Sequence, residues 1–306
     1  MEASKVEKIG RSLQVPSVQE LAKDESATVP SQYIHSDQDP VILSSTDLPE
    51  VPVIDMEILL HGDLMDAELN KFHQSCKEWG FFQLINHGVS DSLLEKVKTE
   101  VVEFFNLPLE EKRKFGQLDG DIEGYGQSSF LAMNILNLMA KALQMNPEEM
   151  EVLFEEGMQS MRMNYYPPCP QPEQVIGLTP HSDATGFTIL FQLNEIDGLQ
   201  ISKDGTWIPI KPLPSAFVIN IGDVLEVVTN GTYRSIEHRG VVSSVKERMS
   251  IATFLSPKVD AEFGPAPSLL SSQAPPKFKR IAAADFFKGY FAQKLAGRCY
   301  LDTLRI

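Results

Sequence analysis

The sequence contains little cysteine and no long apolar run, and each shortage excludes a class of protein. Three cysteines in 306 residues, an odd number spread far apart, support neither a disulfide framework nor a CxxC zinc site. No stretch reaches about 18 consecutive apolar residues, the length that a membrane-spanning helix needs. The opening MEASKVEKIGRSLQVP lacks the apolar core of a secretory signal. We therefore expect a protein of the reducing cytoplasm, with the nucleus as the alternative compartment, and no membrane as a partner.

Positive charge is also scarce. The chain has 27 basic residues against 42 acidic ones, which gives a formal net charge of -15. Such a chain repels a phosphate backbone, so nucleic acid is not an expected partner. The hydrophobic share of 42% and the charged share of 23% are ordinary for a globular protein. The length suits one large domain with a helical region, or two small domains, and we expect a monomer.

Four regions differ in their pattern of apolar residues. Residues 1–50 are polar and form an arm. Residues 51–160 show helical periodicity, most clearly from Asp91 to Asn106, where apolar side chains recur every three or four positions. Residues 161–260 consist of short apolar stretches divided by Pro, Gly, Asn and Asp, and residues 261–306 contain a Pro-rich loop and a last helix. The predicted fold class is α+β, with helices before a β-rich core and a helical tail after it.

The third region has the spacing of an antiparallel sandwich or barrel. Its short apolar stretches are predicted strands, and Asn230–Gly231 predicts a hairpin turn between two of them. The predicted strands read MRMNYY, FTILFQL, LQIS, TWIPI, AFVINIG, VLEVVT, YRSIEH and RMSIATFL.

Three pairs of polar residues lie two positions apart on or beside these strands. Because side chains two apart on a strand point to the same face, each pair presents two polar groups to one side of a sheet. The pairs are His181 with Asp183, Arg248 with Ser250, and Asn164 with Tyr166.

A histidine farther along the chain adds a third group to the first pair. His238 follows His181 by 57 residues and falls on another predicted strand. With Asp183 these histidines give two imidazoles and one carboxylate, the facial triad that holds non-haem Fe(II) in oxygenases and leaves positions open for oxygen and a co-substrate. A zinc hydrolase with similar ligands is an alternative, but it would need a general base nearby and has less use for an Arg–Ser pair.

Arg248 lies inside the apolar stretch RMSIATFL, and a buried guanidinium needs a partner. Its planar fork fits a carboxylate, and the hydroxyl of Ser250 can bond the same oxygens. A small dicarboxylic acid, with one end on the metal and the other on Arg248, Ser250 and Tyr166, would satisfy all these groups.

Each motif has an ordinary interpretation when taken alone. A single HxD sequence is more often a polar turn than a metal site, and Arg248 alone would most simply belong to a structural ion pair. Asn164 and Tyr166 alone would be strand and turn residues. The joint occurrence of all these groups, in this order and on predicted strands, favours a metal site with a bound co-substrate.

Several longer motifs resemble the plant 2-oxoglutarate- and iron(II)-dependent dioxygenases over nearly the whole chain. They are WGFFQLINHGV, NYYPPCPQP, HSD and EHRG followed by ERMSIATF. Further segments are similar to one branch, which holds the senescence-related-gene-type proteins and the codeine and thebaine O-demethylases. These segments are EGYGQ, SMRMNYYPPCPQP, TNGTYRSIEHR and the final LDTLRI.

The resemblance implies a double-stranded β-helix, a cupin-like jelly roll over residues 161–260, preceded by the N-terminal dioxygenase region over 51–160. It implies Fe(II) on His181, Asp183 and His238. For the co-substrate it implies Arg248 and Ser250 at the far carboxylate of 2-oxoglutarate, with Tyr166 beside them and Asn164 near the metal-binding end. The residues that match substrate-pocket positions of relatives are Phe254, Tyr125 and Arg162.

The implied reaction oxidises a small specialised metabolite, an alkaloid or a phenolic, by hydroxylation or O-demethylation. Oxygen and 2-oxoglutarate are consumed, succinate and carbon dioxide are released, and ascorbate serves as a reductant. Two alternatives stay open at this point. One is an ascorbate-dependent oxidase of the same fold, and the other is a non-catalytic remnant that binds metal and co-substrate.

The chain departs from this family directly after Gln127. Relatives continue there with a segment of a few dozen residues that contains a strand and the start of a long helix. Here Gln127 joins SSFLAMNILNLMA almost at once. We expect the missing strand to leave a neighbouring strand edge of the main sheet without its partner. The predicted metal ligands and co-substrate residues all lie downstream of this point.

Overall fold

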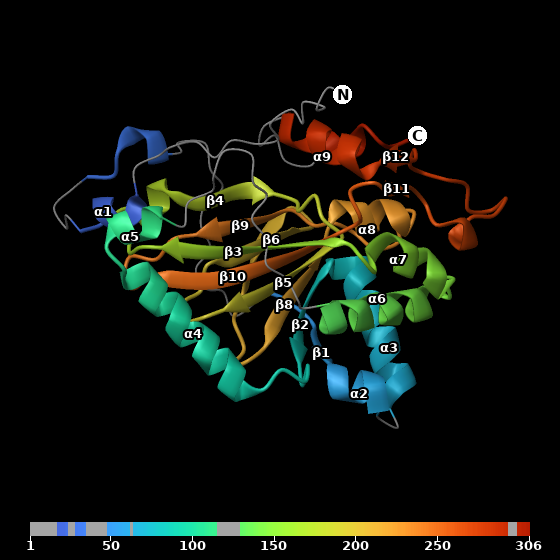
Figure 1. The fold of residues 1–306 in the computed structure, drawn as a ribbon, viewed down its shortest axis with the longest axis horizontal. Helices are drawn as coiled ribbons and strands as arrows, with labels where there is room; N and C mark the ends of the chain where they lie inside the picture. Colours follow the sequence, from blue (N-terminus) through green and yellow to red (C-terminus); the bar gives the residue numbers. More distant parts are fainter. Residues whose placement is uncertain (1–16, 24–27, 35–47, 62–63, 115–128, 293–298) are drawn as a thin grey trace, which may run out of the picture.

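In its described residues, the computed structural model has two main β-sheets with helices on the outside, and β11 (Glu262–Phe263) and β12 (Ile281–Ala282) form a further two-stranded sheet (Figure 1). Tyr125 and Gln127 lie outside the described residues. The model describes residues 17–23, 28–34, 48–61, 64–114, 129–292 and 299–306.

The larger sheet has six strands in the order β1-β2-β8-β5-β10-β3, and the smaller has four in the order β4-β9-β6-β7. All pairings are antiparallel except that of β1 with β2. In the larger sheet the strands are β1 (Val53–Asp55), β2 (Phe81–Ile85), β8 (Phe217–Ile221), β5 (Phe187–Gln192), β10 (Arg248–Ser256) and β3 (Met158–Tyr166). In the smaller sheet they are β4 (Ile176–His181), β9 (His238–Val241), β6 (Leu199–Lys203) and β7 (Thr206–Ile210).

From β3 onward the chain alternates between the two sheets. β3, β5, β8 and β10 belong to the larger sheet, and the strands between them in sequence belong to the smaller one. This alternation is the winding of a double-stranded β-helix, so the predicted jelly-roll core is confirmed. β3 begins at Met158, so the predicted start of the β-region at residue 161 falls three residues late.

Helices cover the apolar face of the larger sheet. One hydrophobic core joins Leu94 and Val101 of α4 to Phe191 of β5 and Ile251 of β10. The helical periodicity from Asp91 to Asn106 is confirmed, because α4 has those bounds and Ser90 caps its first turn. Among the helices packed in this core are α3 (Met65–Gln74), α4 (Asp91–Asn106), α6 (Ser129–Leu143), α7 (Pro147–Phe154) and α8 (Asp223–Val228), together with residues of α2 (Met56–His61), α9 (Ala283–Ala292) and α10 (Cys299–Asp302).

The remaining elements lie at the ends of the chain and between the strands. In this part of the molecule the predicted last helix is confirmed as α9. These elements are α1 (Val18–Leu21), η1 (Ser31–Tyr33), α2 (Met56–His61), η2 (Ser75–Trp79), α5 (Leu109–Arg113), η3 (Pro172–Gln174), β11 (Glu262–Phe263), η4 (Pro267–Leu269), β12 (Ile281–Ala282), α9 (Ala283–Ala292) and α10 (Cys299–Asp302).

Two predicted strands, VLEVVT and YRSIEH, are wrong over most of their length. The stretch VLEVVT forms most of α8 instead, although its three valines favour a strand. The amides that begin this helix, those of Asp223 and Val224, donate to the carbonyl oxygens of Asp183 and Thr185, so a loop elsewhere in the chain satisfies the start of the helix. Tertiary contacts therefore override the local preference.

The predicted hairpin at Asn230–Gly231 is wrong for the same reason. Both residues have positive φ angles, 52° and 75°, as the dipeptide suggests. They follow α8, however, and the amide of Gly231 donates to the carbonyl of Glu226, so the pair ends a helix. The next strand, β9, begins only at His238, so most of YRSIEH is not a strand.

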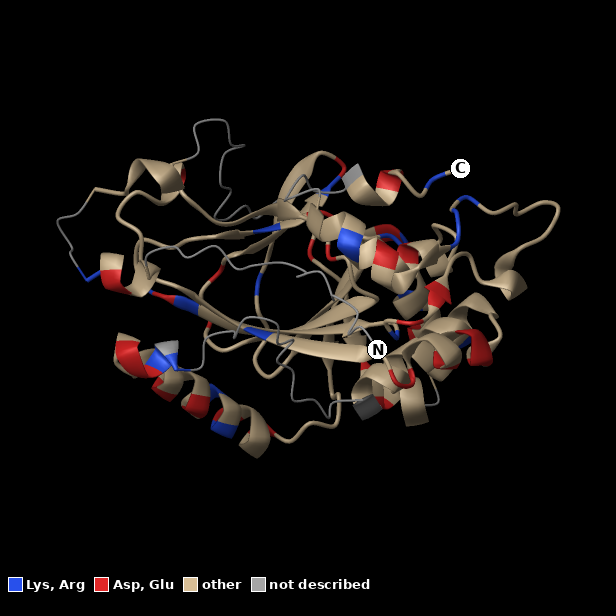
Figure 2. Cartoon of the chain, turned by 45° about the horizontal axis from the view of Figure 1, so that its top comes forward, with Lys and Arg blue, Asp and Glu red and all other residues tan. Residues whose placement is uncertain are grey.

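Acidic positions are concentrated on the helices around the sheets, and the central strands carry few charged residues (Figure 2). None of the helices in the described part of the chain combines the length and apolar character that a membrane crossing requires.

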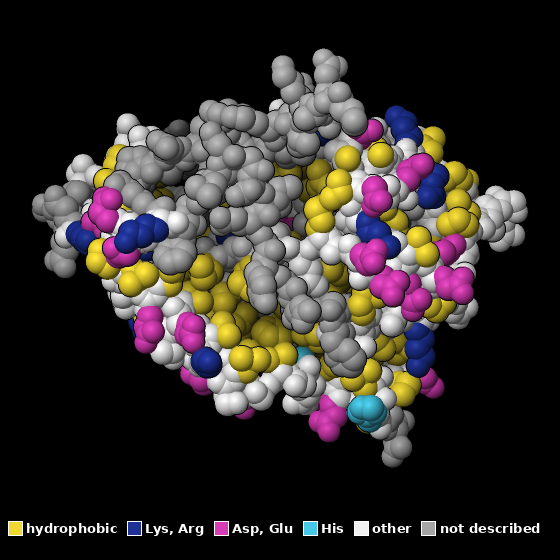
Figure 3. Space-filling view, in the orientation of Figure 1, with side chains coloured by type: hydrophobic (Ala, Val, Ile, Leu, Met, Phe, Trp, Pro, Cys, Tyr) yellow, Lys and Arg dark blue, Asp and Glu magenta, His cyan; other side chains and the backbone are white. Residues whose placement is uncertain are grey.

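β3 ends the larger sheet, and within the described residues it pairs with β10 alone. Its Met161 is 63% exposed and Met163 is 39% exposed. Figure 3 shows hydrophobic side chains gathered on this side of the molecule, above α4. An edge strand nine residues long, with exposed methionines and no proline, is a template for pairing with another chain.

We predict that Met161→Lys lowers self-association at high protein concentration, because a lysine on an edge strand opposes pairing with a second strand. Val152→Lys is the matched control, since Val152 on α7 is 67% exposed but lies on no strand edge. Light scattering over a concentration series measures the effect. Equal behaviour of the two variants would show that the edge has no special part in association.

Candidate metal centre

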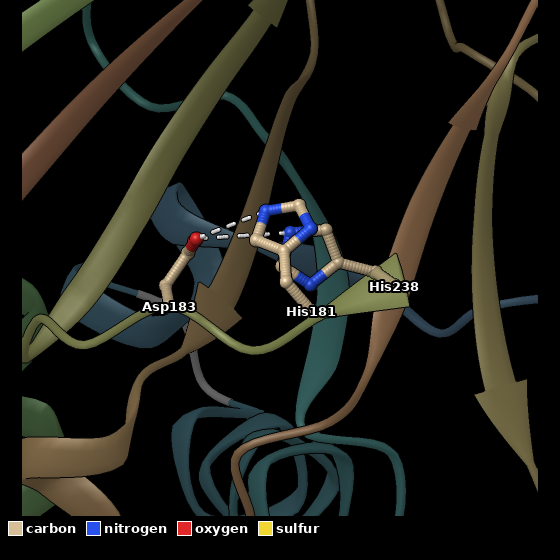
Figure 4. Close-up of side chains that lie close together, drawn as sticks. All are labelled: His181, Asp183 and His238. Atoms are coloured by element: carbon tan, nitrogen blue, oxygen red, sulfur yellow. Dashed lines mark ion pairs between the residues drawn. The ribbon is translucent and has the colours of Figure 1, made fainter. Parts of the chain in front are cut away.

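His181 and His238 lie opposite each other on two paired strands. They are register partners on β4 and β9 of the smaller sheet, and their ring centroids are 4.3 Å apart. Asp183 follows two residues after His181, and Figure 4 shows all three side chains converging. Its Oδ1 lies 3.6 Å from Nε2 of His181 and 3.8 Å from Nε2 of His238. One ligand atom from each residue therefore faces the same small volume.

Backbone carbonyls orient both imidazole rings. Nδ1 of His181 lies 2.8 Å from the carbonyl oxygen of Thr179, and Nδ1 of His238 lies 3.2 Å from that of Ile236. A carbonyl only accepts, so in the neutral ring Nδ1 carries the proton and Nε2 keeps its lone pair. Both lone pairs thus belong to the nitrogens that face Asp183. This is the arrangement by which carbonyl groups fix metal-binding histidines.

Two polar side chains of the larger sheet hold the carboxylate of Asp183. Thr188 on β5 donates from Oγ1 to Oδ2 at 2.5 Å, and Asn220 on β8 donates from Nδ2 to the same oxygen at 2.8 Å. Thr188 and Asn220 are register partners, which is why both reach one atom. Because Oδ2 is occupied, Oδ1 is the oxygen that faces the histidines.

The protonation states of the site suit a divalent cation. Burial, with a further contribution from His238, lowers the pKa of His181 to about 4, so its ring is neutral near pH 7. Burial by itself raises the pKa of Asp183, but the two histidines and the hydrogen bonds from Thr188 and Asn220 outweigh it and the pKa falls below its ordinary value. The site therefore offers one neutral imidazole and one carboxylate in the forms that bind a metal.

The donor set fits a resident metal ion. The three ligand atoms of His181, Asp183 and His238 all lie within 4.8 Å of one another. Two nitrogens and one oxygen on one side of an ion make the two-histidine, one-carboxylate face that leaves the opposite positions open, and this face is typical of Fe(II) in oxygenases.

The predicted co-substrate residues share one face of the larger sheet. In the antiparallel register Arg248 pairs with Tyr166, and Ser250 pairs with Asn164 and with Gln192. Residues directly opposite each other on antiparallel strands point to the same side. The register therefore brings together the four residues that the sequence predicted and adds Gln192 of β5.

Arg248 is a buried cation that forms no ion pair with any described residue. Its side chain is 3% exposed, and no carboxylate lies within 4.0 Å of it in the described part of the chain. Its Nε and Nη2 donate to Oε1 of Gln192 at 3.1 and 2.8 Å, and the guanidinium lies 5.6 Å from the centre of the Tyr166 ring. Burial lowers the pKa of Arg248, and nearby Tyr166 and Asp197 oppose that shift. A buried guanidinium whose hydrogen bonds among the described residues go to a neutral amide is suited to binding an anion.

Close packing against Gly198 fixes the position of the Arg248 side chain. A Cβ added at Gly198 would lie 2.4 Å from Cδ of Arg248, so any side chain there would displace the guanidinium. Ser250 is buried, and its Oγ lies 3.4 Å from Nδ2 of Asn164. Because the amide donates in that contact, the hydroxyl proton of Ser250 remains available to another acceptor.

The two predicted substrate residues in the described part of the chain lie on the same face of the larger sheet. Phe254 pairs with Thr188, and Arg162 pairs with Ala252, the next position on that face. The guanidinium of Arg162 lies 6.0 Å from the centre of the Phe254 ring. Arg162 is exposed, and no carboxylate of the described residues lies within ion-pair distance of it. A cation and an aromatic ring therefore stand side by side on this wall.

Sequence reasoning missed Thr188, Asn220 and Gln192. Each lies in an apolar predicted strand, FTILFQL or AFVINIG, where one or two isolated polar residues are the only local signal. Thr188 and Gln192 are four apart on β5 and so share a face, but only the register with β8 and β10 shows which groups they meet.

The comparisons with known proteins agree with this geometry. Residues 157–257 match the model of the 2OG-Fe(II) oxygenase superfamily. Residues 51–148 match the N-terminal model of the non-haem dioxygenases in morphine synthesis. Among solved structures, that of JOX2 in complex with 2OG, Fe and JA superposes with a TM-score of 0.82 and 28% identity, covering 96% of this chain and 98% of that one.

Three plant relatives align over most of both chains. The oxoglutarate-dependent flavonoid 7-O-demethylase 1 of Ocimum basilicum is 51% identical over 97% of this chain and 93% of its own length. Protein SRG1 of Arabidopsis thaliana is 48% identical over 96% and 97%. Codeine O-demethylase of Papaver somniferum is 44% identical over the full length of both chains.

The alignment lengths reveal the internal deletion that the sequence predicted. The alignment with codeine O-demethylase spans 360 positions, whereas this chain has 306 residues, so at least 54 positions of the relative have no counterpart here. Both family regions are nevertheless present in order. Together with the metal site, these matches show that the chain belongs to the 2OG-Fe(II) oxygenase superfamily and is a 2-oxoglutarate-dependent dioxygenase.

Proposed function

We propose that this dioxygenase removes a methyl group from a small methoxylated phenolic or alkaloid, with Fe(II) held by His181, Asp183 and His238. The convergence of two Nε2 atoms and Oδ1 of Asp183 on one volume supports the ligand set. The names of the similar proteins, a flavonoid 7-O-demethylase and a codeine O-demethylase, support the reaction. Fe(II) supplies the open coordination positions at which 2-oxoglutarate and oxygen meet, and it carries the oxidation.

The chain binds 2-oxoglutarate along the wall formed by β3, β5 and β10. Arg248 takes the carboxylate far from the metal through its planar fork, and Ser250 donates its free hydroxyl proton to the same group. Burial raises the pKa of Tyr166, so its phenol stays protonated and serves as a further donor. Asn164, on the same face, lies toward the other end of the co-substrate. Ascorbate is the reductant that keeps the metal ferrous.

The organic substrate lies against Phe254 and Arg162, with Tyr125 as a further predicted wall residue outside the described part of the chain. The Phe254 ring offers an apolar surface to an aromatic substrate. The guanidinium of Arg162, which has no carboxylate beside it in the described residues, favours a phenolate or another polar group of the substrate.

The overall reaction balances for a methoxy group. Oxygen and 2-oxoglutarate are converted to succinate and carbon dioxide, and one oxygen atom is inserted into a C–H bond of the methyl group. The resulting hemiacetal releases formaldehyde and leaves a hydroxyl group on the substrate. The chain's own part is to hold the methyl group at the metal and to exclude water from it.

A second candidate function follows from the deletion. At least 54 positions of the codeine O-demethylase alignment are absent, so the chain is alternatively a remnant that binds metal and 2-oxoglutarate without oxidising a metabolite. We further propose that the enzyme is a monomer of the cytoplasm. Buried free thiols at Cys76 and Cys169 support a reducing compartment.

We predict that incubation with methoxylated flavonoids and alkaloids, Fe(II), 2-oxoglutarate and ascorbate yields formaldehyde and succinate in equal amounts. Liquid chromatography of the demethylated product and enzymatic formaldehyde measurement provide the readout, and Asp183→Ala is the inactive control. Thermal stabilisation by Mn(II) and 2-oxoglutarate without any succinate would favour the remnant. Turnover that needs ascorbate and proceeds without 2-oxoglutarate would point to the oxidase of the same fold.

Asn220→Ala should weaken metal binding roughly 10- to 100-fold, because Asp183 loses one of the two bonds that aim its Oδ1 at the histidines. Titration with Mn(II) in the absence of 2-oxoglutarate measures the affinity. The control is Asn194→Ala, which removes two hydrogen bonds to backbone groups, at Glu247 and Met249, without touching a ligand. Equal affinity in the two variants would argue against a role for Asn220.

Arg248→Lys should weaken 2-oxoglutarate binding by roughly tenfold or more, while metal binding without the co-substrate is unchanged. A lysine keeps the charge but loses the two-pronged contact, and hydrogen bonds to charged groups are worth about 1.5–3 kcal/mol. Anaerobic titration of the Fe(II)-loaded chain, followed by its visible charge-transfer band, measures the affinity. Arg280→Lys, on the surface and paired with Glu262, is the matched control. An unaltered affinity in Arg248→Lys would place the far carboxylate elsewhere.

A further inference from the structure

A tyrosine from the C-terminal helix reaches the backbone between the metal ligands. The hydroxyl of Tyr290, on α9, donates to the carbonyl oxygen of Ser182 at 3.1 Å. Ser182 is fully buried and stands between His181 and Asp183 in the sequence. The two residues in this contact are 108 positions apart, so the C-terminal segment folds back onto the metal centre.

Beside the bonds from Thr188 and Asn220 to its side chain, the loop that carries Asp183 is held at its backbone and at Ser182 by α8. The amides that start α8 bond it: Asp223 N donates to Asp183 O at 2.8 Å, and Val224 N donates to Thr185 O at 3.1 Å. The hydroxyl of Ser182 bonds Oδ2 of Asp223 at 3.2 Å. The bonds of these amides and of the Ser182 hydroxyl all involve α8, whereas the contact from Tyr290 comes from α9.

The surroundings of Tyr290 keep it a donor. Burial, together with the nearby carboxylates of Asp223 and Asp183, raises the pKa of Tyr290 to about 12, while Arg162 opposes the shift. The phenol therefore retains its proton throughout the neutral range and can donate to the carbonyl. The hydroxyl of Tyr290 is therefore close enough to Asp223, Asp183 and Arg162 for their charges to act on it.

We propose that Tyr290 is a positioning residue of the metal centre, whose bond to the Ser182 carbonyl fixes the backbone that aims His181 and Asp183 at one ion. The proposal rests on the ligand set proposed above. A carbonyl held in place fixes the peptide plane between Ser182 and Asp183, and that plane sets the direction in which the Asp183 side chain leaves the backbone. Ligands held by such supporting bonds bind a metal more tightly than ligands that must be ordered on binding.

Contacts of the last residues with the rest of the chain help to keep the C-terminal region next to the loop of Asp183. Arg305 forms an ion pair with the buried Glu226 of α8 at 2.8 Å, and the amide of Ile306 donates to the carbonyl of Lys277. Helix α8 thus bonds the loop of Asp183 and also forms an ion pair with the C-terminal segment. Tyr290 of α9, in the same C-terminal region, bonds that loop as well. The C-terminal segment is therefore part of the frame of the metal centre.

The test compares Tyr290→Phe with Tyr300→Phe in the full chain. Both substitutions remove a tyrosine hydroxyl of the C-terminal region that donates to a backbone carbonyl, but the acceptor of Tyr300 is Asp285, away from the metal loop. The affinity for Mn(II) alone, the charge-transfer band of the anaerobic Fe(II)–2-oxoglutarate complex, and the melting temperature of the metal-free chain are measured for each. We expect Tyr290→Phe to lower Mn(II) affinity roughly 10- to 100-fold and to shift the band. Tyr300→Phe should leave both unchanged, and the metal-free melting temperatures of the two variants should be similar.

Three results would overturn the proposal in distinguishable ways. Wild-type affinity and an unshifted band in Tyr290→Phe would remove the positioning role and leave the ligand set intact. Equal losses of affinity in both variants would assign the effect to general stability of the C-terminal region. If the wild-type chain itself bound neither Mn(II) nor Fe(II), the proposed ligand set would be wrong, and the role of Tyr290 would be lost with it.

Discussion

The antiparallel register of the larger sheet is the constraint on which the whole site depends. Residues directly opposite each other share a face, so one choice of register places Ser250, Asn164 and Gln192 together on the inner side. The same choice sends Ile251 and Phe191 to the outer side, where the helices bury them. A slip of one residue in β10 would exchange the two sets, removing both the anion site and the core. Burial of the apolar outer face therefore also determines which polar residues lie on the inner face.

The inner face holds two buried charges that neutral groups support. The carboxylate of Asp183 accepts from Thr188 and Asn220, and the guanidinium of Arg248 donates to Gln192. Neutral hydrogen bonds satisfy the geometry of a buried ion but leave its charge uncompensated. A divalent cation at the first and a carboxylate at the second would compensate both. A metal-bound dicarboxylate would supply both compensating charges in one molecule, which gives a physical reason for the co-substrate of this family.

The internal deletion and the C-terminal segment affect different parts of the molecule. Within the described residues β3 is the last strand of the larger sheet, and methionines are exposed at its edge on the outer face, where we expect the absent segment to have paired. The C-terminal segment contacts the loop of Asp183 and the helix α8, next to the inner face. The described chain therefore contains the charged residues of the candidate site and the residues that orient the candidate metal ligands. The part of the larger sheet next to β3 has less covering structure. We therefore expect the deletion to affect stability and substrate selection more than the metal chemistry.

The sequence by itself singled out the candidate ligands, the candidate co-substrate arginine and the strand character of most of the β-region, because spacing two apart on a strand is a local property that residue types reveal. It failed at VLEVVT and at Asn230–Gly231, where contacts with distant residues turned a strand-like and hairpin-like stretch into a helix and its end. Only the tertiary structure decided that Thr188 and Asn220 hold Asp183, that Gln192 holds Arg248, and that Tyr290 reaches Ser182. These groups meet across strands or helices far apart in the chain, and no spacing in the sequence records which of them the fold brings within hydrogen-bond distance.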